Sequence, residues 1–186
     1  MKKLLALLAL STTASASDLY VNAQYQQNTG QREASVVGES LEFDIDGSGQ
    51  KYQAGYKNVF VYHEKNKVGD EAQFSDGRSE RSFGVGFRAN GEAVGRFTPY
   101  IEASIGKATA HFSERDVRAF RLLNDSINGL VFSGTLGAKF NIVENVSFIA
   151  GGSYTGTSWE SFRIYGETAE TTDRHLGLFA GVELAL

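Results

Sequence analysis

The chain has 186 residues and a formal net charge of -4 at pH 7, with 21 glycines, a single proline and no cysteine. The acidic balance argues against nucleic acid as a partner, and the lack of cysteine excludes a disulfide framework. No stretch after residue 16 is apolar for the roughly 18 residues that a membrane-spanning helix needs.

The first residues have the pattern of a secretory signal peptide. Lys2 and Lys3 precede an apolar segment at residues 4–10, and Ala14-Ser15-Ala16 is an A-x-A cleavage site. We therefore predict a signal peptide over residues 1–16. The remaining residues 17–186 have the length of one domain, which we expect outside the cytoplasm.

Several later segments have an apolar residue at every second position. In chain order they cover residues 19–26, 82–89, 101–106, 130–140, 146–155 and 175–186. Because side chains alternate between the two faces of a strand, each segment has one apolar face and one small or polar face. This period is typical of barrel strands with lipid outside and a polar lumen.

Residues 38–67 must supply two more strands if the strand count is even. In the interpretation we prefer, one strand ends at residues 52–56, the chain turns at Lys57-Asn58, and the next strand runs from Val59 to about Lys65. That strand needs a bulge near residues 47–49 to bring three earlier apolar residues into register: Leu41, Phe43 and Ile45. The alternative places the turn at Asp46-Gly47-Ser48-Gly49, which is a good hairpin sequence.

The connections fall into a short set and a long set. Short turns are predicted near Lys57-Asn58 and at residues 90–97 and 141–145, and long polar connections at residues 28–48, 66–80, 113–128 and 158–173. Barrels of the outer membrane alternate short periplasmic turns with long external loops in this way. The third long connection has the pattern of a short amphipathic helix over residues 116–123.

The last strand shows the strongest alternation. We predict that its apolar stripe faces lipid: Leu176, Leu178, Val182, Leu184 and Leu186. The final six residues also resemble the C-terminal signal read by the barrel-assembly machinery, with leucine in place of the usual final aromatic residue. That machinery is therefore an expected partner during biogenesis.

The overall layout is similar to that of a known group of barrels. Its most recognisable piece is Phe83-Gly84-Val85-Gly86-Phe87, followed after a turn by a strand that starts with Pro99-Tyr100. This layout resembles the small eight-stranded outer-membrane barrels of the OmpA/OmpX type, over essentially the whole mature chain. The resemblance implies an all-β, eight-stranded, antiparallel, up-and-down transmembrane β-barrel in the outer membrane of a Gram-negative bacterium. It implies no single function.

Charged residues occur on the strand faces predicted to point inward. An eight-stranded barrel is only wide enough inside for side chains, and buried charges are costly unless they are paired. We therefore predict an internal ion-pair network, and prefer a structural plug to a gated ion path: Lys57, Arg88, Glu102, Lys139 and Glu183. Five aromatic residues are expected to form interfacial girdles: Tyr25, Tyr100, Phe140, Tyr154 and Trp159.

One pair of residues has a catalytic interpretation. His111 and Ser113 lie two apart near the predicted external rim and resemble the His-x-Ser pair of outer-membrane lipid A deacylases, although Glu114 replaces that family's Asn. They could act as base and nucleophile if Glu114, Asp116 or Asp125 oriented the histidine. We prefer a solvated rim. No His, Asp and Glu grouping has metal-ligand spacing, so neither a metal nor a cofactor is expected.

The function predicted from the sequence is non-enzymatic. An outer-membrane barrel would contribute to envelope integrity, or to surface interaction and adhesion, through its external loops. Its expected partners are outer-membrane lipid, lipopolysaccharide and an unidentified surface partner. The alternatives are a small lipid-modifying enzyme that uses the His-x-Ser pair, and a secreted lipocalin-like barrel with an apolar interior.

Overall fold

A computed structural model describes residues 18–36, 38–70, 78–119, 125–164 and 166–186. Within them the chain is made almost entirely of long strands, with one short helix, α2 (Glu114–Ala119). The strands are β1 (Leu19–Val36), β2 (Glu39–Tyr56), β3 (Val59–Asp70), β4 (Arg78–Asn90), β5 (Phe97–His111), β6 (Ser126–Val143), β7 (Val146–Trp159), β8 (Phe162–Ile164) and β9 (Glu167–Ala185).

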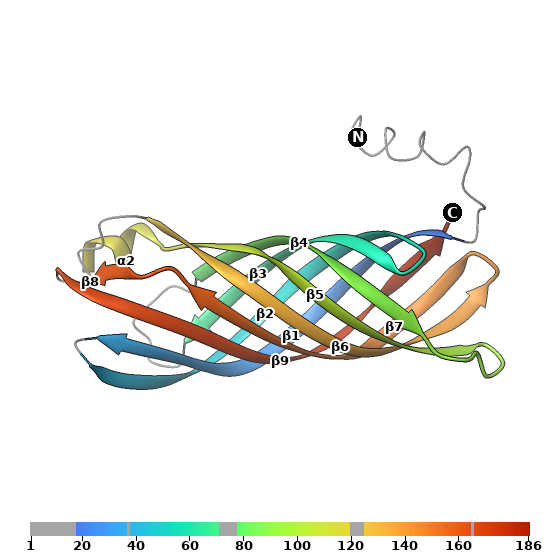
Figure 1. The fold of residues 1–186 in the computed structure, drawn as a ribbon, viewed down its shortest axis with the longest axis horizontal. Helices are drawn as coiled ribbons and strands as arrows, with labels where there is room; N and C mark the ends of the chain where they lie inside the picture. Colours follow the sequence, from blue (N-terminus) through green and yellow to red (C-terminus); the bar gives the residue numbers. More distant parts are fainter. Residues whose placement is uncertain (1–17, 37, 71–77, 120–124, 165) are drawn as a thin grey trace, which may run out of the picture.

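The strands close into a barrel, as Figure 1 shows. Each long strand pairs antiparallel with the next long strand, and β9 pairs with β1, so that β1–β7 and β9 form an eight-stranded up-and-down barrel. The pairings can be followed once around the barrel, from each residue to its partner on the next strand. Starting at Thr29 of β1 and passing first to β9, then to β7 and finally to β2, this path returns to β1 at Leu19. That offset means that the strands are tilted. The predicted fold class is confirmed.

Three short turns gather at one end of the barrel, here called the short-turn end. They join Tyr56 to Val59, Asn90 to Phe97 and Val143 to Val146, close to the predicted positions. At the first, Lys57 takes a φ of 53°, the left-handed conformation that a tight hairpin requires. In the third hairpin the strand continues to Val143, and the register shifts between Asn141 and Val143.

The strands extend further toward the other end, here called the loop end, than the sequence indicated. β1 and β2 pair without a break from Leu19 opposite Tyr56 to Val36 opposite Glu39. The alternative turn at residues 46–49 is therefore wrong, as is the bulge that the preferred interpretation required. The predicted long connection at residues 28–48 is also wrong, because both strands continue through it.

The physical reason lies in what fills the barrel near the loop end. Ile45 is fully buried and faces inward, on the strand face opposite to that of Tyr52. Other buried side chains there form an apolar core: Ala108, Ala110, Ile127, Val131 and Trp159. This part of the interior is packed with apolar side chains. The apolar residues of β2 therefore point inward near the loop end and outward near the short-turn end, and no bulge is needed between them.

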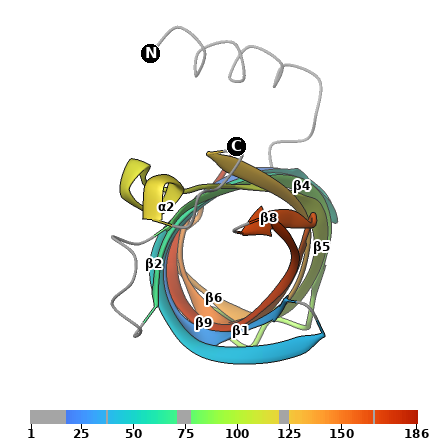
Figure 2. The same ribbon diagram turned by 90° about the vertical axis from the view of Figure 1, so that its left-hand side faces the viewer.

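The short strand β8 belongs to this closure. It pairs with the start of β9, and Phe162 packs against the apolar core. Seen from the loop end in Figure 2, β8 lies within the ring formed by the long strands. We call the apolar core, together with Phe112 and Phe162, the apolar cap.

The barrel wall has an apolar outer face and a polar inner face over its short-turn half. On β9 the outward side chains are Leu176, Leu178, Val182 and Leu184, which are 63%, 75%, 46% and 41% exposed. Leu186 follows the end of β9 and is partly exposed. Buried polar side chains face the lumen: Asn22, Gln24, Gln26, Gln53 and Thr135. A lipocalin-like barrel would have the opposite polarity.

Two predictions fall partly or wholly outside the described residues. The helix predicted at residues 116–123 is α2, which starts earlier, at Glu114, and is described as far as Ala119. The signal peptide and its cleavage site lie outside the described residues. Among the residues that are described, no helix is both long enough and apolar enough to cross a membrane.

Candidate functional site

The candidate site is the interior of the barrel, which two arginine clusters cross. Arg78 and Arg88 lie on β4, and their acidic partners Asp173 and Glu183 lie on β9. In the order of strands around the barrel, β4 and β9 stand on opposite sides. Each cluster therefore bridges the full width of the lumen. We call them the upper cluster, near the loop end, and the lower cluster, near the short-turn end.

The lower cluster is built around Arg88, whose side chain is 1% accessible. Its Nε donates to Glu102 Oε1 at 2.7 Å, and its Nη1 donates to Glu183. Lys139 Nζ lies 3.4 Å from the other oxygen of Glu183. Gln53 accepts from Arg88 at 3.1 Å and donates to Glu102 at 3.1 Å. Two cations thus balance two carboxylates in a closed network.

Two tyrosine rings hold the Arg88 guanidinium between them. Its central carbon lies 4.4 Å from the Tyr20 ring centroid and 4.6 Å from that of Tyr100. Each tyrosine is paired across the sheet with a glycine, Gly55 or Gly137. A Cβ at Gly55 would lie 2.3 Å from the Tyr20 ring, and one at Gly137 would lie 2.4 Å from the Tyr100 ring. The glycines therefore leave room for the rings that stack on Arg88.

The structure brings four of the five predicted lumen residues together and leaves Lys57 outside. Lys57 lies in the first short turn, its side chain is 58% exposed, and its Nζ is 4.0 Å from Asp18. The inward direction of Lys57 was predicted by continuing the strand alternation to this position. Lys57 lies in a turn, where side chains do not alternate between two faces, so the prediction is wrong for this residue. Lys57 lines a cavity of about 370 Å³ below the lower cluster, together with Tyr20, Arg88 and Glu183.

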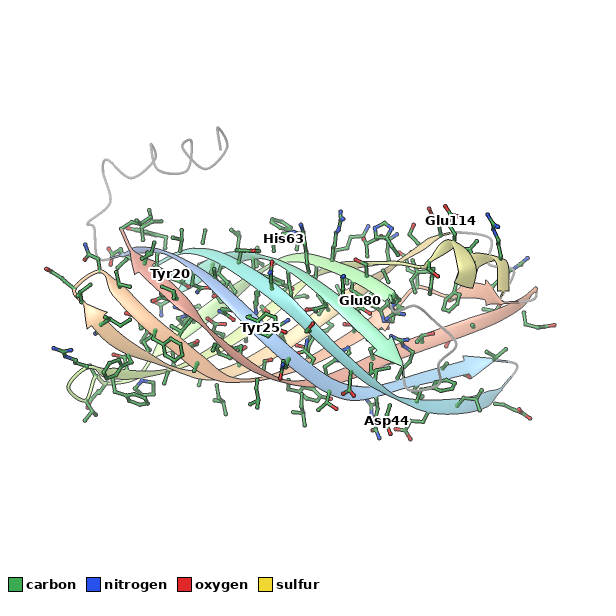
Figure 3. All side chains as sticks on the ribbon, turned by 180° about the vertical axis from the view of Figure 1, so that it is seen from behind. Tyr20, Tyr25, Asp44, His63, Glu80 and Glu114 are labelled. Atoms are coloured by element: carbon green, nitrogen blue, oxygen red, sulfur yellow. The ribbon has the colours of Figure 1, made fainter. Side chains whose placement is uncertain are left out.

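The upper cluster repeats this chemistry with different residues. Arg78 bonds to Glu80 and to Asp173, and Arg32 Nε donates to Asp173 Oδ1 at 2.7 Å. The Arg78 guanidinium stacks 4.5 Å from the Trp159 ring, and Trp159 Nε1 donates to Asp173 at 2.9 Å. The Trp159 side chain therefore connects the upper cluster to the apolar cap. Figure 3 shows Glu80 nearer the loop end and Tyr20 nearer the short-turn end.

Asp173 is fully buried beyond the outward apolar stripe of β9, on the loop-end side of Leu176. Burial alone would raise the pKa of its carboxyl group. The Arg78 and Arg32 guanidiniums outweigh burial and hold that pKa below its usual value. The carboxylate therefore stays ionised, and its charge anchors both arginines across the lumen.

Three upper residues have atoms that could ligate a metal. Ligand atoms of Glu80, Asp173 and His175 lie within 4.8 Å of one another, and all three side chains are buried. This grouping could not be recognised in the sequence, because Glu80 is far from Asp173 and His175 along the chain. Both carboxylates are, however, already paired with Arg78. A metal ion would have to compete with a fixed guanidinium, so the arrangement favours an ion-pair plug.

The aromatic girdle prediction is wrong for two of its five residues. Tyr25, Phe140 and Tyr154 point outward and are 52%, 48% and 53% exposed. Tyr100 and Trp159, in contrast, are 2% and 5% exposed and belong to the two clusters. The alternation of side chains predicts the inward direction of Tyr100, because Tyr100 lies two residues from Glu102 and therefore on the same face of β5.

The His-x-Ser pair lies at the end of a strand. His111 is the last residue of β5, exposed, and on the outward face with Lys107. Ser113 follows in the connection to α2, where the Phe112 amide donates to the Asp125 carbonyl at 2.9 Å. Both residues are therefore at the loop end, and His111 points away from the lumen.

Comparisons with known proteins address the fold. No family model and no curated protein matches the sequence. Among solved structures, Neisserial surface protein A is 14% identical with a TM-score of 0.56, covering 92% of this chain and 98% of that one. The outer membrane protein AlkL is 11% identical with a TM-score of 0.51, covering 95% and 94%. The fold is that of small outer-membrane β-barrels. At these identities the comparisons establish architecture alone.

Proposed function

We propose that the protein is a non-enzymatic outer-membrane barrel that acts at its loop end, in envelope integrity or in surface interaction and adhesion. One observation carries this proposal: the two arginine clusters and the apolar cap fill the lumen at successive levels, so the barrel interior is a support and not a passage. The strands continue beyond the outward apolar stripes and present charged side chains there, such as Glu33, Asp44 and Arg81.

The outer face supports the membrane placement. Apolar residues alternate outward on every long strand of the short-turn half, which matches the pattern of lipid-facing barrel walls. In that setting the surrounding partners are outer-membrane lipid and lipopolysaccharide, and the barrel-assembly machinery acts during biogenesis. The external partner of the loop end stays unidentified.

The first test is fractionation of cells that produce the full chain. The protein should stay in the outer-membrane fraction after carbonate or urea washing and should migrate differently on a gel before and after boiling. Extraction into the soluble fraction would contradict the membrane placement. Lipid A mass spectrometry on the same cells addresses the enzyme alternative, because an acyl chain lost only when both His111 and Ser113 are present would establish catalysis.

A second prediction concerns conductance. An eight-stranded lumen is filled by side chains, whereas roughly 16–18 strands are needed for an aqueous channel. The purified protein in a planar bilayer should therefore show no large, stable, porin-sized conductance steps. Such steps in the wild-type protein would contradict a structural plug built on Arg88 and Asp173.

A further inference from the structure

The outward face near the loop end has a segregated charge pattern. Four exposed cations lie on three adjacent strands and form what we call the basic face: Lys65 and Lys67 on β3, Arg81 on β4 and Lys107 on β5. Four exposed acids lie on β1 and β2 and form the acidic face: Glu33, Glu42, Asp44 and Asp46. The two faces adjoin, because β2 pairs with β3 and Ser48 lies opposite Lys67, but the acids lie mostly further toward the loop end.

The strands that carry the basic face supply no counter-charge to it within their described outward positions, although Asp46 of β2 lies diagonal to Lys67. Lys65 is paired across the sheet with Arg81, so two like charges stand directly opposite each other on one face. Such a pair destabilises a sheet unless an anion offsets it. The outward positions of β3, β4 and β5 that are described carry no acidic residue, and Glu64, Glu80 and Glu102 lie on the inward faces.

The second feature of the basic face is its position along the barrel axis, here called its height. On β4 the outward residue next to Arg81 is Phe83, which is 62% exposed, and on β5 the outward residue next to Lys107 is Ile105, which is 44% exposed. Both cations therefore follow directly on the outward apolar residues. In a bilayer this is the depth of the lipid headgroups, where basic side chains meet phosphate.

The acidic face lies further from the apolar residues. On β2 the outward positions beyond Tyr52 are Gln50 and Ser48, and only then Asp46. Two copies that stand side by side in one membrane align their apolar residues, so the basic face of one copy would not meet the acidic face of the next. This height difference favours a lipid headgroup over a second copy as the occupant of the basic face.

We propose that the basic face binds the phosphate groups of lipopolysaccharide, the phosphate-bearing lipid expected around the loop end. The inference rests on the proposed outer-membrane function and names a partner for it. Lys65 and Arg81 are direct cross-strand neighbours, close enough to share one phosphate. Lys107 continues the face onto β5, and Lys67 continues it along β3. Arginine presents a fork of donors to phosphate, and lysine presents a point charge.

The test measures binding of fluorescently labelled lipopolysaccharide to the purified full-length mature barrel in nonionic detergent. The basic-face variant carries Lys65→Gln, Lys67→Gln, Arg81→Gln and Lys107→Gln. We expect it to bind at least roughly tenfold more weakly, because each basic side chain near an anionic lipid surface contributes about a factor of five before screening. Dephosphorylated lipopolysaccharide should bind the wild-type protein as weakly as intact lipopolysaccharide binds the variant.

Two control variants make the result specific. Lys57→Gln with Arg96→Gln removes cations from the short-turn end, and an acidic-face variant carries Glu33→Gln, Glu42→Gln, Asp44→Asn and Asp46→Asn. The first should bind lipopolysaccharide as the wild-type protein does, and the second should bind it at least as tightly, because the second removes only negative charge. Equal binding by the basic-face variant, or equal binding of the dephosphorylated lipid, would overturn the inference. An equal loss in the acidic-face variant would also overturn it and indicate contact between copies.

The same samples separate this inference from the proposed function. Each variant is checked for the gel shift of a folded barrel and for insertion into phosphatidylcholine vesicles before binding is measured. If the wild-type protein does not insert, the proposed function is contradicted, and so is the inference, because it requires a membrane around the basic face. A basic-face variant that inserts normally and binds lipopolysaccharide normally overturns the inference and leaves the proposed function standing.

Discussion

Replacing Arg88 with methionine is expected to destabilise the folded barrel by about 3–5 kcal/mol, because removal of one partner leaves buried charges uncompensated. Glu102 and Glu183 would both lose their guanidinium, and Tyr20 and Tyr100 would lose the group on which they stack. Methionine keeps much of the side-chain volume of arginine. The decrease in the free energy of unfolding therefore comes more from the lost charge than from lost packing. Urea unfolding of the protein in lipid vesicles measures the change.

The controls distinguish a cross-barrel plug from a general effect of losing an arginine. Arg174→Met removes an exposed, outward arginine from β9 and should change the free energy of unfolding by no more than about 0.5 kcal/mol. A quadruple variant with Arg88→Met, Lys139→Gln, Glu102→Gln and Glu183→Gln removes the two cations and the two carboxylates together and should regain much of the stability. If Arg88→Met cost no more than Arg174→Met, the lower cluster would not hold the barrel together.

The architecture could be predicted because lipid and lumen impose opposite demands on alternate residues. On β9, for example, Leu178 and Val182 face outward and Glu183 faces inward, so the sequence itself carries the period of a strand. The same alternation predicted that Arg88, Glu102 and Glu183 point inward. It could not show that Tyr20 and Tyr100 would enclose Arg88, because cross-strand register depends on turn positions and strand tilt.

The upper cluster was missed for a different reason. Arg32, Arg78 and Asp173 lie in segments that the sequence analysis assigned to long loops. In the proposed membrane placement, water meets the outer face beyond the outward apolar stripes, whereas packed side chains meet the inner face there. Polar residues are then acceptable outside and apolar residues inside, as Ile45 and Val131 show. The alternation that marks a membrane strand therefore fades although the strand itself continues.

The inside and outside assignment of the closing strand leads to the second large prediction. Val182 faces outward at 46% exposure and pairs with Phe148 and Ala23, well within the outward apolar stripe. Val182→Arg should cost about 2–4 kcal/mol of unfolding free energy if the site is near the membrane midplane, and less toward an interface. Urea unfolding in lipid vesicles measures it.

A matched substitution on the same strand face shows whether this cost comes from lipid. Thr172 has the same outward parity as Val182 but lies beyond Arg174, past the apolar stripe. Thr172→Arg should therefore cost only about 0–1 kcal/mol, because the new charge would be near an interface or in water. Equal costs at the two positions would contradict the lipid-facing assignment. A barrel that accepts arginine at both Leu178 and Val182, and for which leucine at Glu183 is equally harmless, would reverse it, because the face of Glu183 would then be the one that meets lipid.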